Sequence, residues 1–353
     1  MSQFQNRRTV QIEDDSLRLT FTVEGGHLAE IFSKRTGVNP LWSPPWPGIE
    51  PSSYDRKKHP EYGSDSESKL LAGIAGHNLC LDIFGPPSDD EFKAGLTVHG
   101  EASVVPYEFA TSQSELTARA HLPLAHLDVE RNVRLLGNGA IEISEHVQNG
   151  LAMDRPIAWT EHVTLGDPFV QRGVTRLEMP VGNSVTYPED FGTAQRSKAG
   201  VSFSWPHVPA KDGGTLDLRT YPSYSGSSSL TGHLILPERE DAYFQAWNPK
   251  LKTAIAYAWH RADFPWISLW EENGGRTNPP WNGKTITWGV EFGVSPYAEG
   301  RRGMIEGGKI FDTRRYRWLP AATELRVRYL AAVVPCATES EFEAVYQPLV
   351  ALL

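Results

Sequence analysis

Residues 284–294 read KTITWGVEFGV, and their side chains alternate between apolar and small or polar. The apolar positions are Ile286, Trp288, Val290, Phe292 and Val294. Because successive side chains of a β-strand point to opposite faces, all five lie on one face. The stretch therefore predicts a strand with one packed face.

The opposite face of this strand carries small side chains and a single acid. Its positions are Thr285, Thr287, Gly289, Glu291 and Gly293. Glycine weakens a strand and often marks a place where another group approaches the backbone closely. Two interpretations of Glu291 follow: a solvated glutamate at a sheet edge, or a lone acid standing in a cleared space.

The rest of the chain is typical of a large β protein. It holds 11 Trp, 12 Tyr and 14 Phe together with 31 Gly and 26 Pro, which favours strands joined by many turns. Further strands are predicted at residues 17–23, 27–32, 102–109, 115–122, 129–136, 141–147, 156–164, 243–247, 253–259, 266–270 and 325–334. A capping box from Thr338 to Glu341 predicts one short C-terminal helix. We expect an all-β, large antiparallel sandwich in a single domain, residues 1–353.

Charge and cysteine content narrow the class of protein. The net charge of −9 and the lack of a Lys/Arg block argue against nucleic acid as a partner. The N-terminus has no apolar signal segment, and no run approaches the ~18 apolar residues of a membrane span. Cys80 and Cys336 lie in apolar runs and are expected to be buried free thiols. We expect a cytoplasmic protein, a monomer or homodimer, with no membrane partner.

Two histidines are candidates to accompany Glu291. In the predicted strand 156–164, Ala158, Thr160, His162 and Thr164 share one face, so His162 also stands among small residues. His99 precedes Gly100 at a loop-to-strand junction, where glycine permits close approach. Each histidine alone is more often structural. Two cleared faces, each with one titratable group, instead suggest that the faces line one cavity.

The order of these motifs resembles the galactose mutarotase-like (aldose 1-epimerase) superfamily. The matching segments are GGHLAEIFSKRTGVNPLW, TVHGEA, QNGLAMDRPIAWTEHVTLGDPF and WGVEFGVSP, which together span most of the chain. The resemblance implies a β-supersandwich, His99 and His162 as the family's histidines, and Glu291 as its general base. The chain departs from the family after His162, at Phe292 and in lacking a match to its sugar-binding aspartate, as expected of a divergent branch.

The resemblance implies an isomerase that interconverts sugar anomers by acid–base ring opening, without metal or organic cofactor. Glu291 would act as base, His162 as acid, and His99 would hold the sugar. The small-molecule sugar is the expected partner. Its predicted binding residues are Glu101, His77, Gln245, Trp247, Asn248, Trp270 and Trp281. Within this set, the segment FQAWN (residues 244–248) is the nearest candidate to replace the missing aspartate. The tryptophans offer flat apolar faces to the sugar.

Other functions fit the same residues. A non-catalytic carbohydrate-binding protein would keep the aromatic wall and use Glu291 only as a hydrogen-bonding group. An accessory domain of a polysaccharide-degrading enzyme is a third option. A phosphorylated sugar would need clustered cations, for which the pairs Arg301-Arg302 and Arg314-Arg315 are candidates. In the loop 39–68, Trp42 and Trp46 either cap a pocket or pin the loop to the body.

Overall fold

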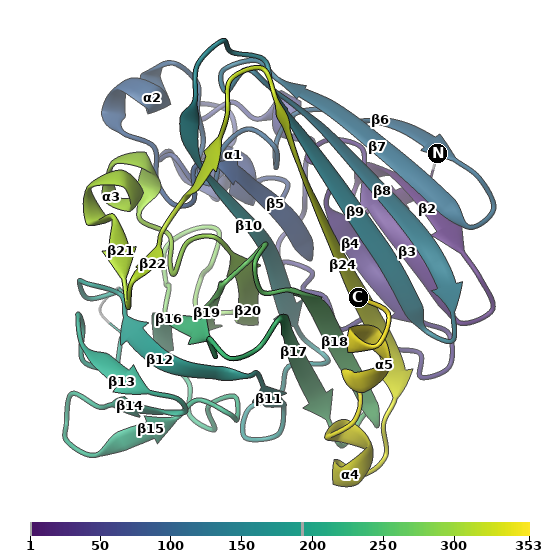
Figure 1. Ribbon diagram of the computed structural model, residues 1–353, viewed down its shortest axis with the longest axis vertical. Coiled ribbons are helices and arrows are strands. Elements are labelled where there is room, and N and C mark those ends of the chain that lie inside the picture. The colour runs from purple at the N-terminus through teal and green to yellow at the C-terminus, as the bar shows by residue number, and fades with distance from the viewer. Residues whose placement is uncertain (1, 192–193) are drawn as a thin grey trace.

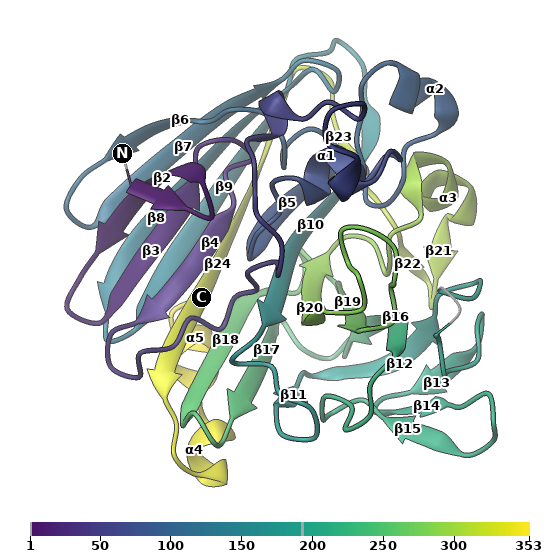
Figure 2. The same ribbon diagram turned by 180° about the vertical axis from the view of Figure 1, so that it is seen from behind.

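The computed structural model describes residues 2–191 and 194–353, and two large antiparallel sheets dominate it (Figures 1 and 2). The first sheet has 12 strands. In sheet order they are β1 (Ser2–Phe4), β2 (Arg7–Glu13), β3 (Leu17–Thr22), β4 (Leu28–Ser33), β5 (His77–Asp82), β10 (Arg155–Gly166), β20 (Ile286–Gly293), β19 (Trp266–Asn273), β16 (Ser227–Ile235), β12 (Val181–Thr186) and β13 (Ser202–Ser204), with β23 (Arg317–Leu319) beside β10.

The second sheet has eight strands and packs against the first. Its order is β11 (Arg176–Glu178), β17 (Asp241–Asn248), β18 (Thr253–His260), β24 (Glu324–Pro335), β9 (Ala140–Asn149), β8 (Leu127–Gly137), β7 (Glu115–Leu122) and β6 (Glu108–Thr111). Two small hairpins lie outside the large sheets: β14 (His207–Pro209) with β15 (Thr215–Asp217), and β21 (Lys309–Ile310) with β22 (Thr313–Arg314). The predicted sandwich of two antiparallel sheets is confirmed.

Helices are short and peripheral. They comprise two 3₁₀ turns (Pro51–Ser53 and Pro60–Tyr62), α1 (Ser68–Leu71), α2 (Asp89–Lys93), α3 (Gly300–Gly307), α4 (Glu339–Phe342) and α5 (Gln347–Val350). The predicted capping box at Thr338 is confirmed at the start of α4, and the C-terminal helical segment is divided into α4 and α5. Within the described part of the chain, no helix is long and apolar enough to cross a membrane.

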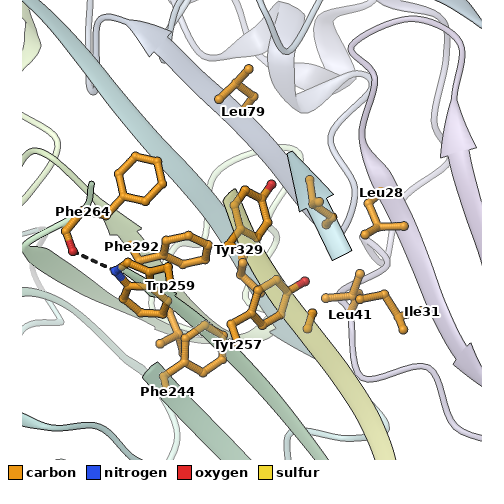
Figure 3. Packing of buried hydrophobic residues seen from close by; sticks show 14 of the residues in the cluster. Leu28, Ile31, Leu41, Leu79, Phe244, Tyr257, Trp259, Phe264, Phe292 and Tyr329 are labelled. Carbon is orange, nitrogen blue, oxygen red and sulfur yellow. Dashed lines mark hydrogen bonds between the residues drawn. The ribbon is translucent and has the colours of Figure 1, made fainter. Parts of the chain in front are cut away.

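The core between the sheets is built from the apolar faces that the alternation predicts. Trp288, Val290, Phe292 and Val294 are all buried there. The ring of Phe292 stacks on that of Trp259 with centroids 4.2 Å apart. Figure 3 shows the aromatic side chains of β17, β18, β20 and β24 converging at this point. Close packing of such large side chains fixes the sheets face to face and so holds the outer face of β20 in place.

One predicted strand begins later in the structure than the sequence indicates. Residues 102–105 form a turn, and the strand predicted at 102–109 begins only at Glu108. The turn arises because the backbone N–H groups of Val104 and Val105 donate to the carbonyl of Glu101 instead of to a neighbouring strand. Cys80 and Cys336 are buried free thiols, as predicted.

Candidate functional site

The outer face of the 12-stranded sheet carries a row of polar residues across adjacent strands. The β10–β20 register pairs Glu161 with Phe292 and Thr164 with Gly289, which places His162 directly opposite Glu291. On the other side, β19 pairs Ser268 with Glu291. Directly opposed side chains have Cβ atoms about 4.5–5.5 Å apart. Sheet register alone therefore brings the predicted acid and base together.

His162 and Glu291 form a close, buried pair. His162 Nε2 lies 3.1 Å from Glu291 Oε1, and the two side chains are 6% and 2% exposed. The other ring nitrogen, His162 Nδ1, lies 3.0 Å from the hydroxyl of Thr164. Burial lowers the pKa of His162 to about 3 and raises the pKa of Glu291 well above its ordinary value. Both effects have the same cause, because a charged group is poorly solvated at this depth, so the resting pair is uncharged.

The glycines of β20 create the space for this pair. A Cβ at Gly289 would lie 2.5 Å from Glu291 Oε1 and 3.1 Å from the ring of Trp270. The predicted close approach is therefore made by the carboxyl group of Glu291 itself, which rests over the bare backbone of Gly289. Glu291 is a buried floor residue and not a solvated edge glutamate.

His99 reaches the same place from a loop. Its backbone has φ of 68°, in the left-handed region, and its Nδ1 accepts a hydrogen bond from the Gly85 N–H at 3.1 Å. Burial holds the pKa of His99 well below its ordinary value, so the ring is neutral and its proton is on Nε2. The ring centroids of His99 and His162 are 5.2 Å apart. His99 thus adds a fixed N–H donor beside the pair.

These residues line a cleft of about 360 Å³. His162 and Glu291 lie in its floor, and Trp270 and Trp281 contribute aromatic surfaces. Residues 65–67 of the long loop and Leu70 of α1 form another side. The volume lies within the usual range of small-molecule sites.

Arg276 is the cation of the cleft. Its guanidinium lies 4.7 Å from the ring centroid of Trp281 and donates to Glu67 at 3.0 Å. Trp281 in turn stacks on Trp42, and the Trp46 indole N–H donates to the carbonyl of Leu71. Trp42 and Trp46 are therefore packed behind the cleft, where they pin the long loop to the body.

Comparison with known proteins gives a consistent fold. No protein-family profile matches the sequence, and no curated protein sequence matches it significantly. Among solved structures, a provisionally assigned aldose 1-epimerase from Klebsiella pneumoniae has a TM-score of 0.70 at 16% identity, with 99% of this chain and 85% of that chain covered. A galactose mutarotase-like protein from Clostridium acetobutylicum has a TM-score of 0.60 at 11% identity, covering 95% and 97%. Another from Lactobacillus casei has 0.58 at 14% identity, covering 92% and 100%.

The chain has the galactose mutarotase-like fold. At 11–16% identity the likeness establishes the architecture and leaves the activity to the site. Among the predicted residues, the galactose mutarotase-like fold brings Glu291, His162 and Trp270 from the sheet together with His99 and Trp281 from loops around one cleft.

Glu101 and His77 lie outside this cleft. The carboxylate of Glu101 accepts the backbone N–H groups of Leu124 and Ala125, both at 2.8 Å, and so stabilises a turn. His77 is fully buried between the sheets, with Nε2 2.9 Å from Glu161. Neither can face a sugar in the cleft, and we remove both from the predicted binding set.

The FQAWN segment also lies elsewhere, because β17 belongs to the second sheet of the galactose mutarotase-like sandwich. Gln245 donates to Glu178 at 3.0 Å, and the Trp247 indole donates to the Cys336 carbonyl at 2.9 Å. Asn248 donates to the Phe169 carbonyl and accepts two turn N–H groups. Their polar groups are satisfied inside the protein, so the prediction that they replace the family's aspartate is corrected.

The basic pairs do not line the cleft either. Arg301 binds Asp82 and Glu91, and Arg315 binds Glu299. The cleft cation, Arg276, was missed by sequence reasoning. Its one sequence signal is its place in the Pro-rich loop 274–283, between two predicted strands and five residues before Trp281.

Proposed function

We propose that this protein is an aldose 1-epimerase-type isomerase that interconverts the anomers of a sugar in the cleft. The observation that carries the proposal is the His162–Glu291 pair, 3.1 Å apart in the floor of the cleft beside Trp270 and Trp281. Anomer exchange needs one base for the C1 hydroxyl proton and one acid for the ring oxygen. This pair supplies both groups at one point.

The pair holds the number of protons that the reaction needs. An uncharged pair, with Glu291 protonated and His162 neutral, carries one acidic proton, apart from the ring N–H that every neutral imidazole keeps. The reactive pair, with a Glu291 carboxylate and a His162 imidazolium, carries the same one proton. Transfer of that proton between the two side chains therefore prepares the base and the acid without exchange with solvent.

Each side chain then has one role in the ring opening. The Glu291 carboxylate takes the proton of the C1 hydroxyl, and the His162 imidazolium gives its proton to the ring oxygen as the C1–O bond of the ring breaks. Rotation about the C1–C2 bond and closure on the other face reverse both transfers. The Nε2–H of His99 donates to a sugar oxygen and orients the ring, and the apolar faces of Trp270 and Trp281 pack on its C–H groups.

Nuclear magnetic resonance tests the proposal directly. Exchange of magnetisation between the α and β anomeric protons would be measured across a panel of aldoses and sugar phosphates. We expect catalysis of one or more of them, and a loss of about 10²- to 10⁴-fold for Glu291→Gln or His162→Gln. Glu108→Gln, an exposed glutamate on β6, is the matched control and should keep full activity.

Two outcomes decide against the proposal. Full activity in Glu291→Gln would remove this carboxyl from the reaction. A sugar that binds in the cleft of the wild type, with no acceleration for any sugar of the panel, would favour the non-catalytic carbohydrate-binding protein. In that function Glu291 would only form hydrogen bonds with the sugar.

A further inference from the structure

Strands β16 and β19 line the cleft on one side of the sheet, and a second cavity of about 340 Å³ lies on their other side. In β19, Trp270 faces the cleft and the next residue, Glu271, faces this cavity. In β16, Leu230 faces the cleft and Ser229 the cavity. We call this cavity the serine chamber, defined by Ser227, Ser229, Glu271, Ser197, Tyr224 and Arg196.

The serine chamber has a carboxyl group built into its wall. Glu271 is 7% exposed and accepts hydrogen bonds from the hydroxyls of Ser227 and Ser229, the latter at 3.5 Å. Burial raises the pKa of Glu271 to about 7. A buried position on this face would normally carry an apolar side chain, as the preceding position of the same face does at Leu269. A carboxyl at such a depth needs polar partners, which the two serines supply only in part.

The rim adds groups of a different character. The Arg196 guanidinium carbon lies 3.7 Å from the ring centroid of Tyr224, so the cation is held against an aromatic face. Its charge acts on Glu271 and offsets a part of the rise that burial causes in the pKa of that carboxyl. The hydroxyl of Ser197 is buried and has no hydrogen-bond partner among residues 2–191 and 194–353. Ser197 is part of the chamber wall, and neighbouring protein atoms cover its Oγ.

Charge selects the chemical class of the ligand. A net anion in the chamber would face the carboxyl of Glu271, and a net cation would face Arg196. A neutral ligand with several hydroxyls satisfies both, because a hydroxyl donates to a carboxylate and accepts from a guanidinium. The walls formed by Leu269 and Trp288 suit the C–H faces of such a ligand.

We propose that the serine chamber is a second binding site, separate from the cleft, for a neutral polyhydroxylated molecule such as a monosaccharide. Glu271 accepts hydrogen bonds from the ligand's hydroxyls, and Arg196 donates hydrogen bonds to its hydroxyl oxygens. The site does not depend on catalysis in the cleft, because the 12-stranded sheet lies between the two.

Fluorine resonances of 5-fluorotryptophan protein report on both sites in one titration. Trp288 lines the chamber, whereas Trp270 and Trp281 line the cleft. Single Trp→Phe variants assign the three resonances. Titration with D-glucose, D-galactose and myo-inositol is expected to give a saturable shift at Trp288, and this shift should persist in Glu291→Gln protein.

Variants test the assignment to the chamber. Glu271→Gln and Arg196→Gln should each weaken the titration read at Trp288 by about tenfold and leave the titration read at Trp270 and Trp281 unchanged. Glu108→Gln is the control, and unchanged shifts of the other tryptophans show that each variant is folded. A Trp288 resonance that none of the three neutral compounds moves would overturn the proposal. Tighter binding of glucose 6-phosphate or glucosamine than of glucose would overturn the neutral class.

Discussion

At the scale of single residues, the Glu291 carboxyl can occupy its position because Gly289 has no side chain. Gly289→Ala would put a methyl group 2.5 Å from Glu291 Oε1, so either the carboxyl or the ring of Trp270 must move. We expect the rate of anomer exchange to fall by about 10²-fold, the usual penalty for a misplaced catalytic group. The control Gly182→Ala should keep full activity, because its added methyl group would meet only the end of the Leu236 side chain, at 3.0 Å. Full activity in Gly289→Ala would show that the carboxyl position is not critical.

The uncharged state of the His162–Glu291 pair sets the pH dependence of the reaction. The pKa of His162 is lowered to about 3, so the pair gains a second proton, and loses its base, only in strong acid. The pKa of Glu291 is raised, so the single proton of the pair is lost only well above pH 4.5. We therefore expect no fall in kcat/KM between neutral pH and about pH 4. A fall with an apparent pKa near 6.5 would show instead that His162 titrates as an ordinary imidazole.

At the scale of elements, β10 serves two networks because its faces alternate. His162 points to the cleft, and its neighbour Glu161 points between the sheets. There Arg131 donates to Glu145 at 2.5 Å and to Glu161 at 3.1 Å, and the Tyr329 hydroxyl contacts both carboxyls. All four side chains are buried. This network links β8, β9 and β24 of one sheet to β10 of the other, and so fixes the strand that carries His162.

Removing the cation should destabilise the fold strongly. Arg131→Met leaves two carboxyls buried without a cationic partner, for which we expect a loss of about 3–5 kcal/mol in the free energy of unfolding, measured with urea. Arg119→Met is the matched control, since Arg119 pairs with Glu130 on the same sheet but is 60% exposed, and should cost less than about 1 kcal/mol. Adding Glu145→Gln to Arg131→Met should restore part of the loss. Equal losses for the two arginine variants would contradict the assigned role of the network.

The strands were predictable from the sequence to the extent that one face is apolar. Residues 284–294 alternate cleanly, residues 156–164 alternate except for Glu161 on the apolar face, and both segments form strands. Residues 102–105 carry the same apolar character, but they pack as a turn, which alternation cannot distinguish. Helix α2 was missed although Ser88 and Glu91 form a capping box, because no apolar periodicity follows on an exposed helix.

At the scale of the whole molecule, sheet order decides which predicted residues meet. His162 and Glu291 are 129 positions apart in the sequence, and they meet because β10 and β20 are neighbours. Gln245 lies on an equally regular strand, but β17 belongs to the other sheet. Strand pairing between distant segments is a tertiary property that no local pattern encodes. The cleft was therefore predictable only where the order of motifs resembled a known fold.

Two distant segments also meet at the cleft through Arg276 and Glu67, which are 209 positions apart. Arg276 contacts Trp281 and the long loop but lies outside the His162–Glu291 pair, so it holds the walls without touching the protons that move. We expect Arg276→Met and Glu67→Gln each to raise KM by about two- to tenfold and to leave kcat unchanged, because a wall contact serves substrate and transition state alike. Steady-state rates from polarimetry separate the two constants.

The matched control for the arginine is Arg302→Met, which removes an exposed cation of α3 that is 86% exposed and should change neither constant. A fall in kcat at constant KM in Arg276→Met would show that the guanidinium contacts the sugar only in the transition state. Arg276 would then act on the charge that develops at the sugar, and the cleft wall would be part of the catalytic machinery. A rise in KM common to both cleft variants instead follows from the geometry, because each variant breaks the same 3.0 Å ion pair that joins the long loop to the β19–β20 connection.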